Sequence, residues 1–178
     1  MTDKEKNSDN ALRLNDEFKI LIATVYGESA SSSETAWQAI AFVIKNRVGS
    51  REWIHHKTVS EVIKKTGFDA HTQRNTPYVS AEKYLNENQD RIGNNKRIER
   101  LIAILAPVYL DKKTDITSGA VLYYSPKAQA ALNKLNPKIW KQEPNWNFSL
   151  LGEVTIPGLL ISDDFRFYKY SPNFNKRK

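Results

Sequence analysis

The sequence contains no cysteine, only three histidines, and no long uninterrupted run of apolar residues. The absence of cysteine excludes disulfide bonds, thiolate nucleophiles and cysteine-based metal sites. The histidines, at positions 55, 56 and 71, are not spaced with one another or with a glutamate as zinc ligands, which argues against a zinc amidase. We therefore expect no metal and no other cofactor. The first ten residues, MTDKEKNSDN, are polar, and neither a signal peptide nor a transmembrane helix is expected.

Glycine is also scarce, and Gly49, Gly67 and Gly93 are isolated from one another, so no glycine-rich phosphate loop can be recognised. The nucleophile elbow of serine hydrolases is absent too. Charge is unbalanced: 27 Lys and Arg against 20 Asp and Glu give a net charge of +7. Such a surface suits a polyanionic partner, either nucleic acid, an anionic membrane or an anionic cell wall. Basic runs at residues 94–97 and 175–178 raise the possibility of nucleic-acid binding, but no nucleic-acid-binding module supports it.

The length of 178 residues, with 40% apolar and 26% charged residues, fits one globular domain. We expect a flexible segment over residues 1–14, a domain over 15–170 and a basic tail over 171–178. The patterning predicts an α+β fold that is mostly helical, with a small β element.

Helix and strand signals follow one another along the chain. Asp16 is predicted to cap a helix that ends at Gly27 and the polar run 29–33, and Ser31 with Glu34 has the spacing of a capping box for the next helix. The remaining predicted elements are a helix over 58–66 begun by Thr58, a loop over 67–77, a helix over 80–88, a long amphipathic helix over 97–113 with a break at Pro107, a turn over 115–119, a strand over 120–125, short helical pieces and loops over 126–149, and one or two strands over 153–170.

Glu28 is the first candidate for chemistry. It follows an apolar helix and lies beside Gly27, before a polar turn into a second helix. Apolar neighbours such as Val25 and Tyr26 would desolvate the carboxyl and raise its pKa, as a general acid for glycosidic bond cleavage requires. An exposed carboxylate at a helix end is the competing interpretation.

Several segments together resemble the cell-wall hydrolase family of the spore-cortex hydrolase SleB and CwlJ type. That family has an apolar helix ending in Tyr-Gly-Glu, a variable turn, and a helix carrying Gln-Ala-Val-Ala and ending in Leu-Asn-Arg. The resemblance covers about residues 17–170. The matching segments, in order, are Tyr26-Gly27-Glu28-Ser29, Gln38-Ala39-Ile40-Ala41, Lys45-Asn46-Arg47-Val48, Gly67-Phe68-Asp69, residues 115–124 (DITSGAVLYY) and residues 165–169 (FRFYK).

The resemblance implies a lysozyme-like fold and a lytic transglycosylase that cuts peptidoglycan between N-acetylmuramic acid and N-acetylglucosamine. Glu28 stands at the position of the family's catalytic acid/base. Peptidoglycan glycan strands are the implied partner, and the protein would act as a bacteriolytic glycosidase. Substrate contacts are expected from the loop and strand motifs and from nearby aromatic residues: Phe68, Asp69, Tyr78, Tyr123, Tyr124, Ser125 and Trp146.

The chain departs from the family pattern at three places. Phe165 or Asp164 stands where the family has histidine, Gly67 replaces a glutamine, and residues 134–151 match poorly. The reaction type therefore stays open. If the reaction is hydrolytic, Asp69, Asp115 or Asp163 would supply a second carboxylate.

Two further functions stay open beside glycan cleavage: an N-acetylmuramoyl-L-alanine amidase and a non-catalytic peptidoglycan-binding module. We expect a monomer that acts on the bacterial cell wall, in the periplasm or outside the cell. Phage delivery through a holin or transport by a secretion machine would bring it there, and an inhibitor or immunity protein is a further expected partner.

Overall fold

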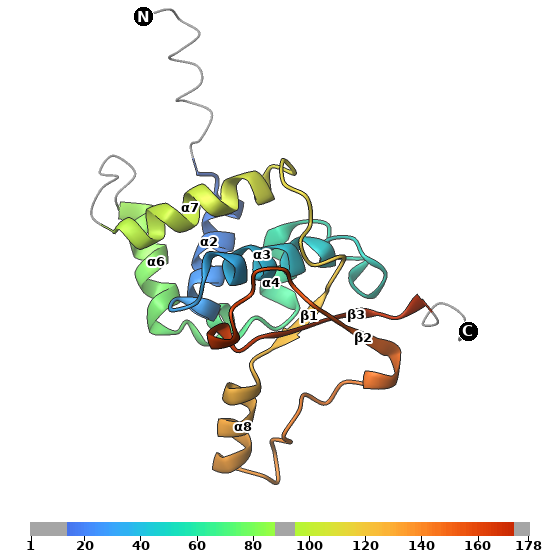
Figure 1. Cartoon of the computed structure of the whole chain (residues 1–178). Coiled ribbons are helices and arrows are strands. Elements are labelled where there is room, and N and C mark those ends of the chain that lie inside the picture. Colours follow the sequence, from blue (N-terminus) through green and yellow to red (C-terminus); the bar gives the residue numbers. More distant parts are fainter. Residues whose placement is uncertain (1–13, 88–94, 173–178) are drawn as a thin grey trace, which may run out of the picture.

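A computed structural model describes residues 14–87 and 95–172, which form an α+β fold that is mostly helical, as predicted (Figure 1). Residues 1–13, 88–94 and 173–178 are not described. They include most of the segment predicted over 1–14, the last residue of the helix predicted over 80–88, the basic run 175–178 and most of the tail predicted over 171–178. Those predictions lie outside the described residues. The elements are α2 (Asp16–Ser29), α3 (Glu34–Arg47), α4 (Val59–Lys65), α5 (Asp69–Gln73), α6 (Thr76–Glu87), α7 (Lys96–Tyr109), β1 (Leu122–Tyr124), α8 (Pro126–Leu135), β2 (Leu151–Val154) and β3 (Arg166–Tyr170), with short 3-10 turns at 51–53, 148–150 and 161–163.

Helix α2 is the centre of the helical part and packs against α3, α4, α5, α6 and α7. Leu21, Ile22 and Val25 are completely buried, since neighbours cover this helix on several sides. Its N-cap is Asn15, whose side chain accepts from the backbone N–H of Phe18, so the prediction of Asp16 as the cap is wrong. An asparagine satisfies the free N–H groups of a first turn as well as an aspartate does. The helix also continues through Gly27 to Ser29 instead of ending at the glycine.

Helix α3 begins with Ser33 as its N-cap, not with the Ser31–Glu34 capping box that the spacing predicts. The Ser33 hydroxyl accepts from the N–H of Ala36, while the Ser33 N–H and hydroxyl both donate to the carboxylate of Asp163. A distant carboxylate therefore selects which serine becomes the cap. The helix predicted to begin after Thr58 is confirmed as α4, with Thr58 in a capping box.

The predicted loop over 67–77 is wrong, because this segment contains α5 and the start of α6. Phe68 and Ala70 are buried against the helical core, so tertiary packing stabilises a short helix that has little apolar periodicity of its own. Helix α6 starts four residues before the predicted position. There the Asn75 side chain accepts from the N–H of Tyr78, and Pro77 fits the first turn.

The long amphipathic helix is confirmed as α7, although it ends at Tyr109 and not at residue 113. Its buried side follows helical spacing through Ile98, Leu101, Ile104, Leu105 and Val108. Pro107 lies within the last turn, so the proline accompanies the end of the helix without breaking it earlier.

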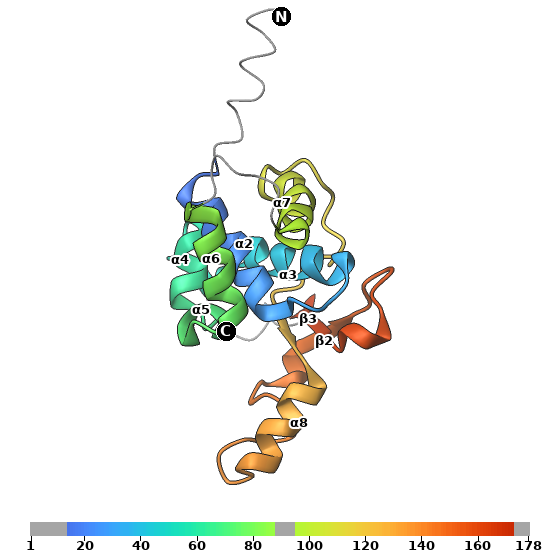
Figure 2. The same cartoon turned by 90° about the vertical axis from the view of Figure 1, so that its left-hand side faces the viewer.

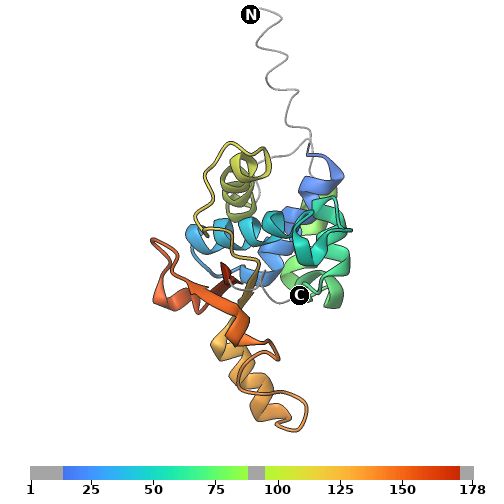
Figure 3. The same ribbon diagram turned by 90° about the vertical axis from the view of Figure 1, so that its right-hand side faces the viewer.

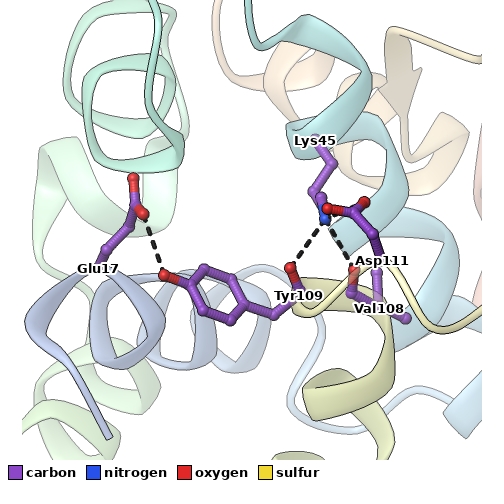
Figure 4. Close-up of polar contacts among 5 residues, drawn as sticks. All are labelled: Glu17, Lys45, Val108, Tyr109 and Asp111. Atoms are coloured by element: carbon purple, nitrogen blue, oxygen red, sulfur yellow. Dashed lines mark hydrogen bonds and ion pairs between the residues drawn. The ribbon is translucent and has the colours of Figure 1, made fainter.

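A lysine from α3 closes the carboxyl end of α7 (Figure 4). Lys45 Nζ donates to the carbonyl oxygens of Val108 and Tyr109, each at 2.9 Å, and lies 2.5 Å from Asp111 Oδ1. At the other side of the same turn, the Tyr109 hydroxyl donates to Glu17 of α2 at 3.0 Å. These contacts satisfy carbonyl groups that a helix end leaves free, and they fix α7 to both α2 and α3.

Replacing Lys45 with methionine should lower the free energy of unfolding by about 1–2 kcal/mol, because two carbonyl groups lose a charged donor. Urea denaturation would measure the change. Lys83→Met is the matched control, since Lys83 is exposed and its ion pair with Glu87 is 3.9 Å long. Equal midpoints for the two variants would contradict the capping role of Lys45.

The sheet has the order β1-β3-β2, and both pairings are antiparallel. This confirms the strand predicted within 120–125. The one or two strands predicted over 153–170 are two, β2 and β3, and β2 begins two residues earlier than predicted. Tyr123 pairs with Phe167 and Tyr124 with Arg166, so neighbouring tyrosines point to opposite sides of the sheet. Tyr123 points toward α2, whereas Tyr124 contacts Trp146 on the other side.

Helix α8 and the segment that returns from it form an arm, residues 126–147, that projects away from the helical part (Figures 2 and 3). No residue of α8 is buried. Two side-chain bonds join the helix to the returning segment: Gln129 Nε2 donates to the Lys141 carbonyl at 2.8 Å, and Asn133 Nδ2 to the Trp140 carbonyl at 2.6 Å. Helix α8 is therefore joined to the returning segment by polar contacts and not by an apolar core.

Across residues 14–87 and 95–172, none of the helices combines the length and apolarity needed to cross a membrane.

Candidate active site

Glu28 lies in the last turn of α2, where two other parts of the chain bind its carboxyl group. The N–H of Ala70, at the start of α5, donates to Glu28 Oε1 at 2.8 Å. The hydroxyl of Tyr123, on β1, donates to Oε2 at 2.9 Å. Both carboxyl oxygens are thus held, while the residue keeps partial solvent exposure. A carboxyl held in a fixed orientation by two donors is suited to proton transfer.

Burial raises the pKa of Glu28 above that of an ordinary glutamate. The bonds from Ala70 and Tyr123 act in the opposite direction because they stabilise the charged form, and so does the nearby Arg47. The charge of Asp69 raises the pKa further. Desolvation dominates, so Glu28 retains its proton to a higher pH than a free glutamate would.

Gly27 allows α5 to come close enough to reach Glu28. A Cβ atom at this position would lie 2.6 Å from the Cβ of Ala70, 2.9 Å from the Cβ of Tyr78 and 3.0 Å from Asn75 Oδ1. Asn75 Nδ2 also donates to the Gly27 carbonyl at 3.0 Å. The glycine is required for contact between helices, not for a turn, because it lies inside α2.

Arg47, at the end of α3, is the main site residue that sequence reasoning missed. It is 6% exposed, and burial lowers its pKa to about 10. Its Nε donates to the Val121 carbonyl at 2.7 Å, and Nη1 donates to the Thr66 hydroxyl at 2.9 Å. The guanidinium lies 4.7 Å from the centre of the Phe68 ring. Arg47 therefore joins α3 to the residue before β1 and to the segment between α4 and α5, and it places a positive charge near Glu28.

The ring of Tyr123 is held in an aromatic group. Its centre lies 5.8 Å from Phe167 and from Phe165, and 6.4 Å from Phe68. Burial raises the pKa of Tyr123 well above its usual value, and the negative charge of Glu28 adds to this. The hydroxyl therefore remains protonated and serves as a donor to the carboxylate.

Asn46 and Asp115 fix the approach to β1. Asn46 Nδ2 donates to Asp115 Oδ2 at 3.0 Å and to the Ala120 carbonyl at 3.0 Å. Asp115 also accepts from the N–H groups of Thr117 and Gly119, which confirms the predicted turn. Burial raises the pKa of Asp115, but these hydrogen bonds together outweigh it and the net shift is downward. Asp115 thus serves the turn and Asp163 serves the α3 cap, and neither is among the charges that shift the pKa of Glu28.

The structure brings three of the predicted contact residues to Glu28: Phe68, Asp69 and Tyr123. Phe68 is 2% exposed and packs beneath the site, whereas Asp69 is exposed at the start of α5. Tyr78 is 2% exposed, so its ring packs in the core and does not face solvent. The residue joins the site only through its close approach to Gly27 and its backbone bond to Asn75.

Tyr124, Ser125 and Trp146 are not gathered around Glu28. Tyr124 and Trp146 contact each other on the far side of β1. Ser125 is the N-cap of α8, accepts from the N–H of Ala128 and donates to Asp164. The Ser125 hydroxyl thus both donates and accepts a hydrogen bond within the fold.

A groove of about 420 Å³ begins next to the aromatic group. Phe165, whose ring touches that of Tyr123, forms part of its wall together with Pro126, Val154, Ile156 and Arg166. We call this the β2 groove. Through Phe165 the groove borders the aromatic group that holds Tyr123.

Replacing Tyr123 with phenylalanine should move the alkaline limb of the pH–activity profile to higher pH. The hydroxyl lowers the pKa of Glu28, so its removal raises that pKa, and the protonated acid persists to higher pH. Initial rates measured over a pH series would show the shift. Tyr124→Phe, on the opposite face, is the control and should leave the limb in place. A limb that moves to lower pH in Tyr123→Phe would contradict the assignment.

Within the part of the chain that the structure describes, no group of three or more His, Asp or Glu side chains could hold a metal ion. Comparison with protein-family models, curated proteins and solved structures gave no significant match.

Proposed function

We propose that this protein is a peptidoglycan-cleaving enzyme with a lysozyme-like catalytic domain, and that it acts as a lytic transglycosylase with Glu28 as general acid and base. The observation that carries the proposal is the state of Glu28. It is a single, partly buried carboxyl with a raised pKa, held by the Ala70 N–H and the Tyr123 hydroxyl.

The meeting of distant motifs gives independent support. The Gly27-Glu28 pair, Asn46-Arg47, the Phe68-Asp69 segment, the turn at 115–119 and Tyr123 are far apart in sequence, and each is part of the resemblance to the SleB-type hydrolases. In the fold they are joined to one another by hydrogen bonds and ring contacts around one carboxyl. Motifs that merely stabilised separate elements would have no reason to meet at a titratable group.

The proposed reaction needs one carboxyl in two protonation states. Glu28 first gives its proton to the glycosidic oxygen, and the bond from C1 of the muramic sugar to that oxygen breaks. The 6-hydroxyl of the same sugar then attacks C1, and Glu28 accepts its proton as the 1,6-anhydro ring closes. No water is consumed. The Ala70 and Tyr123 donors stabilise the carboxylate between the two steps, and burial favours its return to the acid.

Hydrolysis is the second candidate, and Asp69 is the residue that favours it. Its charge is close enough to raise the pKa of Glu28, and it is exposed to solvent. A second carboxylate near the acid is what an ordinary glycosidase uses to activate water or to act as nucleophile.

Digestion of purified peptidoglycan tests the bond that is cut. The proposal predicts release of soluble sugar without new amino termini, because the glycan strand is broken and the peptides stay attached. New amino termini would instead identify an amidase. Binding to the insoluble wall with no release of either product would favour a non-catalytic binding module.

A further inference from the structure

A second and larger groove, of about 690 Å³, lies between the arm and the sheet. We call it the arm groove. It is on the face of β1 opposite to Tyr123, and it shares Pro126 and Arg166 with the β2 groove. The two grooves are therefore neighbours, and Phe165 of the β2 groove contacts Tyr123, which is the hydrogen-bond partner of Glu28.

One wall of the arm groove is aromatic. Trp146 lies edge to face against Tyr124, with ring centres 5.7 Å apart, and it also contacts Phe148 at 5.9 Å. Tyr168 of β3 supports Trp146 and Phe148 from behind, at 6.0 and 5.4 Å. Rings braced in this way offer flat apolar surface at little entropic cost, which suits stacking on a sugar ring.

The rest of the lining of the arm groove is largely polar and carries more cations than carboxylates. Lys134, Lys141 and Arg166 line it against one carboxylate, Glu143. Three amide side chains also line the groove and offer both donors and acceptors: Asn133, Gln142 and Asn145. Aromatic surface next to amides and cations matches a ligand that combines N-acetylated sugar rings with carboxylates.

The groove is open because the arm does not collapse onto the sheet. The α8 residue Ala130, which lines it, is small, and α8 has no buried side chain. The Ser125–Asp164 hydrogen bond anchors the base of α8, and two side-chain bonds hold α8 to the returning segment. In ligand sites, polar groups that converge beside aromatic surface fix the orientation of the ligand.

We propose that the arm groove is an accessory site for peptide-bearing sugars of the glycan strand. Trp146 stacks on a sugar ring, and Lys134 and Lys141 meet carboxylates of the attached peptide. This inference rests on the proposed function for the class of ligand. The accessory site would bind peptide-bearing glycan strands at a distance from the point of cleavage, and it would bind them more tightly than glycan chains without peptides.

Binding should be measured by calorimetry in the Glu28→Gln background, so that the ligand is not consumed. The probes are a purified peptide-bearing muropeptide tetrasaccharide and a neutral N-acetylglucosamine tetramer. The peptide-bearing probe should bind more tightly. Trp146→Ala should weaken both by about tenfold, the loss expected for one aromatic contact. Lys134→Gln with Lys141→Gln should weaken only the peptide-bearing probe and reduce the dependence of its binding on salt.

Two further variants distinguish a blocked groove from a misfolded arm. Ala130→Trp fills the groove from the exposed surface of α8 and should weaken binding as Trp146→Ala does. Trp140→Ala is the matched control, because Trp140 is 44% exposed on the same arm and does not line the groove. Equal affinities for Trp146→Ala, Ala130→Trp and Trp140→Ala would overturn the proposal.

The two proposals can fail separately. If wild-type protein cleaves glycan but neither probe depends on the groove, the accessory site is wrong and the catalytic assignment stands. If the groove binds the peptide-bearing probe but the protein cuts no glycan, the accessory site stands and the catalytic function is wrong.

Discussion

Replacing Glu28 with glutamine should reduce the rate of peptidoglycan solubilisation about 100-fold or more, the usual contribution of a general acid and base. Glutamine has nearly the shape of the protonated acid and can still accept from the Ala70 N–H, but it has no proton to transfer. Release of soluble sugar from purified peptidoglycan would measure the rate. The Asp69→Asn variant separates mechanisms, because a transglycosylase should tolerate it, whereas a two-carboxylate hydrolase should lose activity with both changes.

The stability of the Glu28→Gln variant gives the control for folding. The pKa of Glu28 is raised in the folded state, so the wild type loses stability as pH rises from the unfolded value through the folded value. Glutamine removes that loss. The variant should therefore be at least as stable as the wild type at pH 8, and thermal melts would show it. Inactivity with a much lower melting temperature would attribute the defect to folding and not to chemistry.

Replacing Gly27 with alanine should lower the free energy of unfolding by about 2 kcal/mol or more, because the new Cβ would overlap the Cβ atoms of Ala70 and Tyr78. Both obstacles are attached directly to backbone, so α5 and α6 would have to move away from α2. That movement would also break the Ala70 bond to Glu28, and activity should fall together with stability. Chemical denaturation and peptidoglycan digestion of the same variant would measure both effects.

Gly152→Ala is the matched control for this substitution. Gly152 lies in β2, and no atom lies within 4 Å of the Cβ that alanine would add. Its effect on stability should stay within about 0.5 kcal/mol, as for substitutions elsewhere that avoid close contacts. If the two alanine variants were equally stable, the close approach of α5 to Gly27 would be incorrect.

The parts of the fold that can be predicted well from sequence are those specified by local chemistry. Thr58 marks a helix start, the Asp115 carboxylate accepts from an N–H group within its own turn, and the apolar spacing of α7 is regular. The alternation of Tyr123 and Tyr124 also places one ring toward the site and the other away from it. Each of these signals lies within a few residues of the structure it determines.

The failures have long-range causes. Ser33 caps α3 because Asp163, 130 residues away, binds it, so no local pattern could select Ser33 over Ser31. Helix α5 forms where Phe68 and Ala70 are buried, and its shortness leaves no periodicity to detect.

At the site, the motif predicts Glu28 as the candidate, but two of the groups that act on its pKa, Arg47 and the Ala70 N–H, are not predicted from the sequence. Arg47 has the sequence context of an ordinary cation at the end of a helix, and only the fold shows it buried against Thr66 and Val121. Ala70 contributes a backbone N–H, which has no side-chain signature at all. Trp146 is a candidate for sugar contact from its residue type, yet its position in a separate groove depends on the fold of the arm.

Mass spectrometry of purified peptidoglycan, digested in parallel with the wild type and with Glu28→Gln, tests the central claim most directly. We predict wild-type products that are each lighter by one water than the corresponding hydrolysed muropeptide, and loss of nearly all of these products with Glu28→Gln. Products with ordinary reducing ends, or the same products at the same rate from both proteins, would contradict a transglycosylase that depends on Glu28.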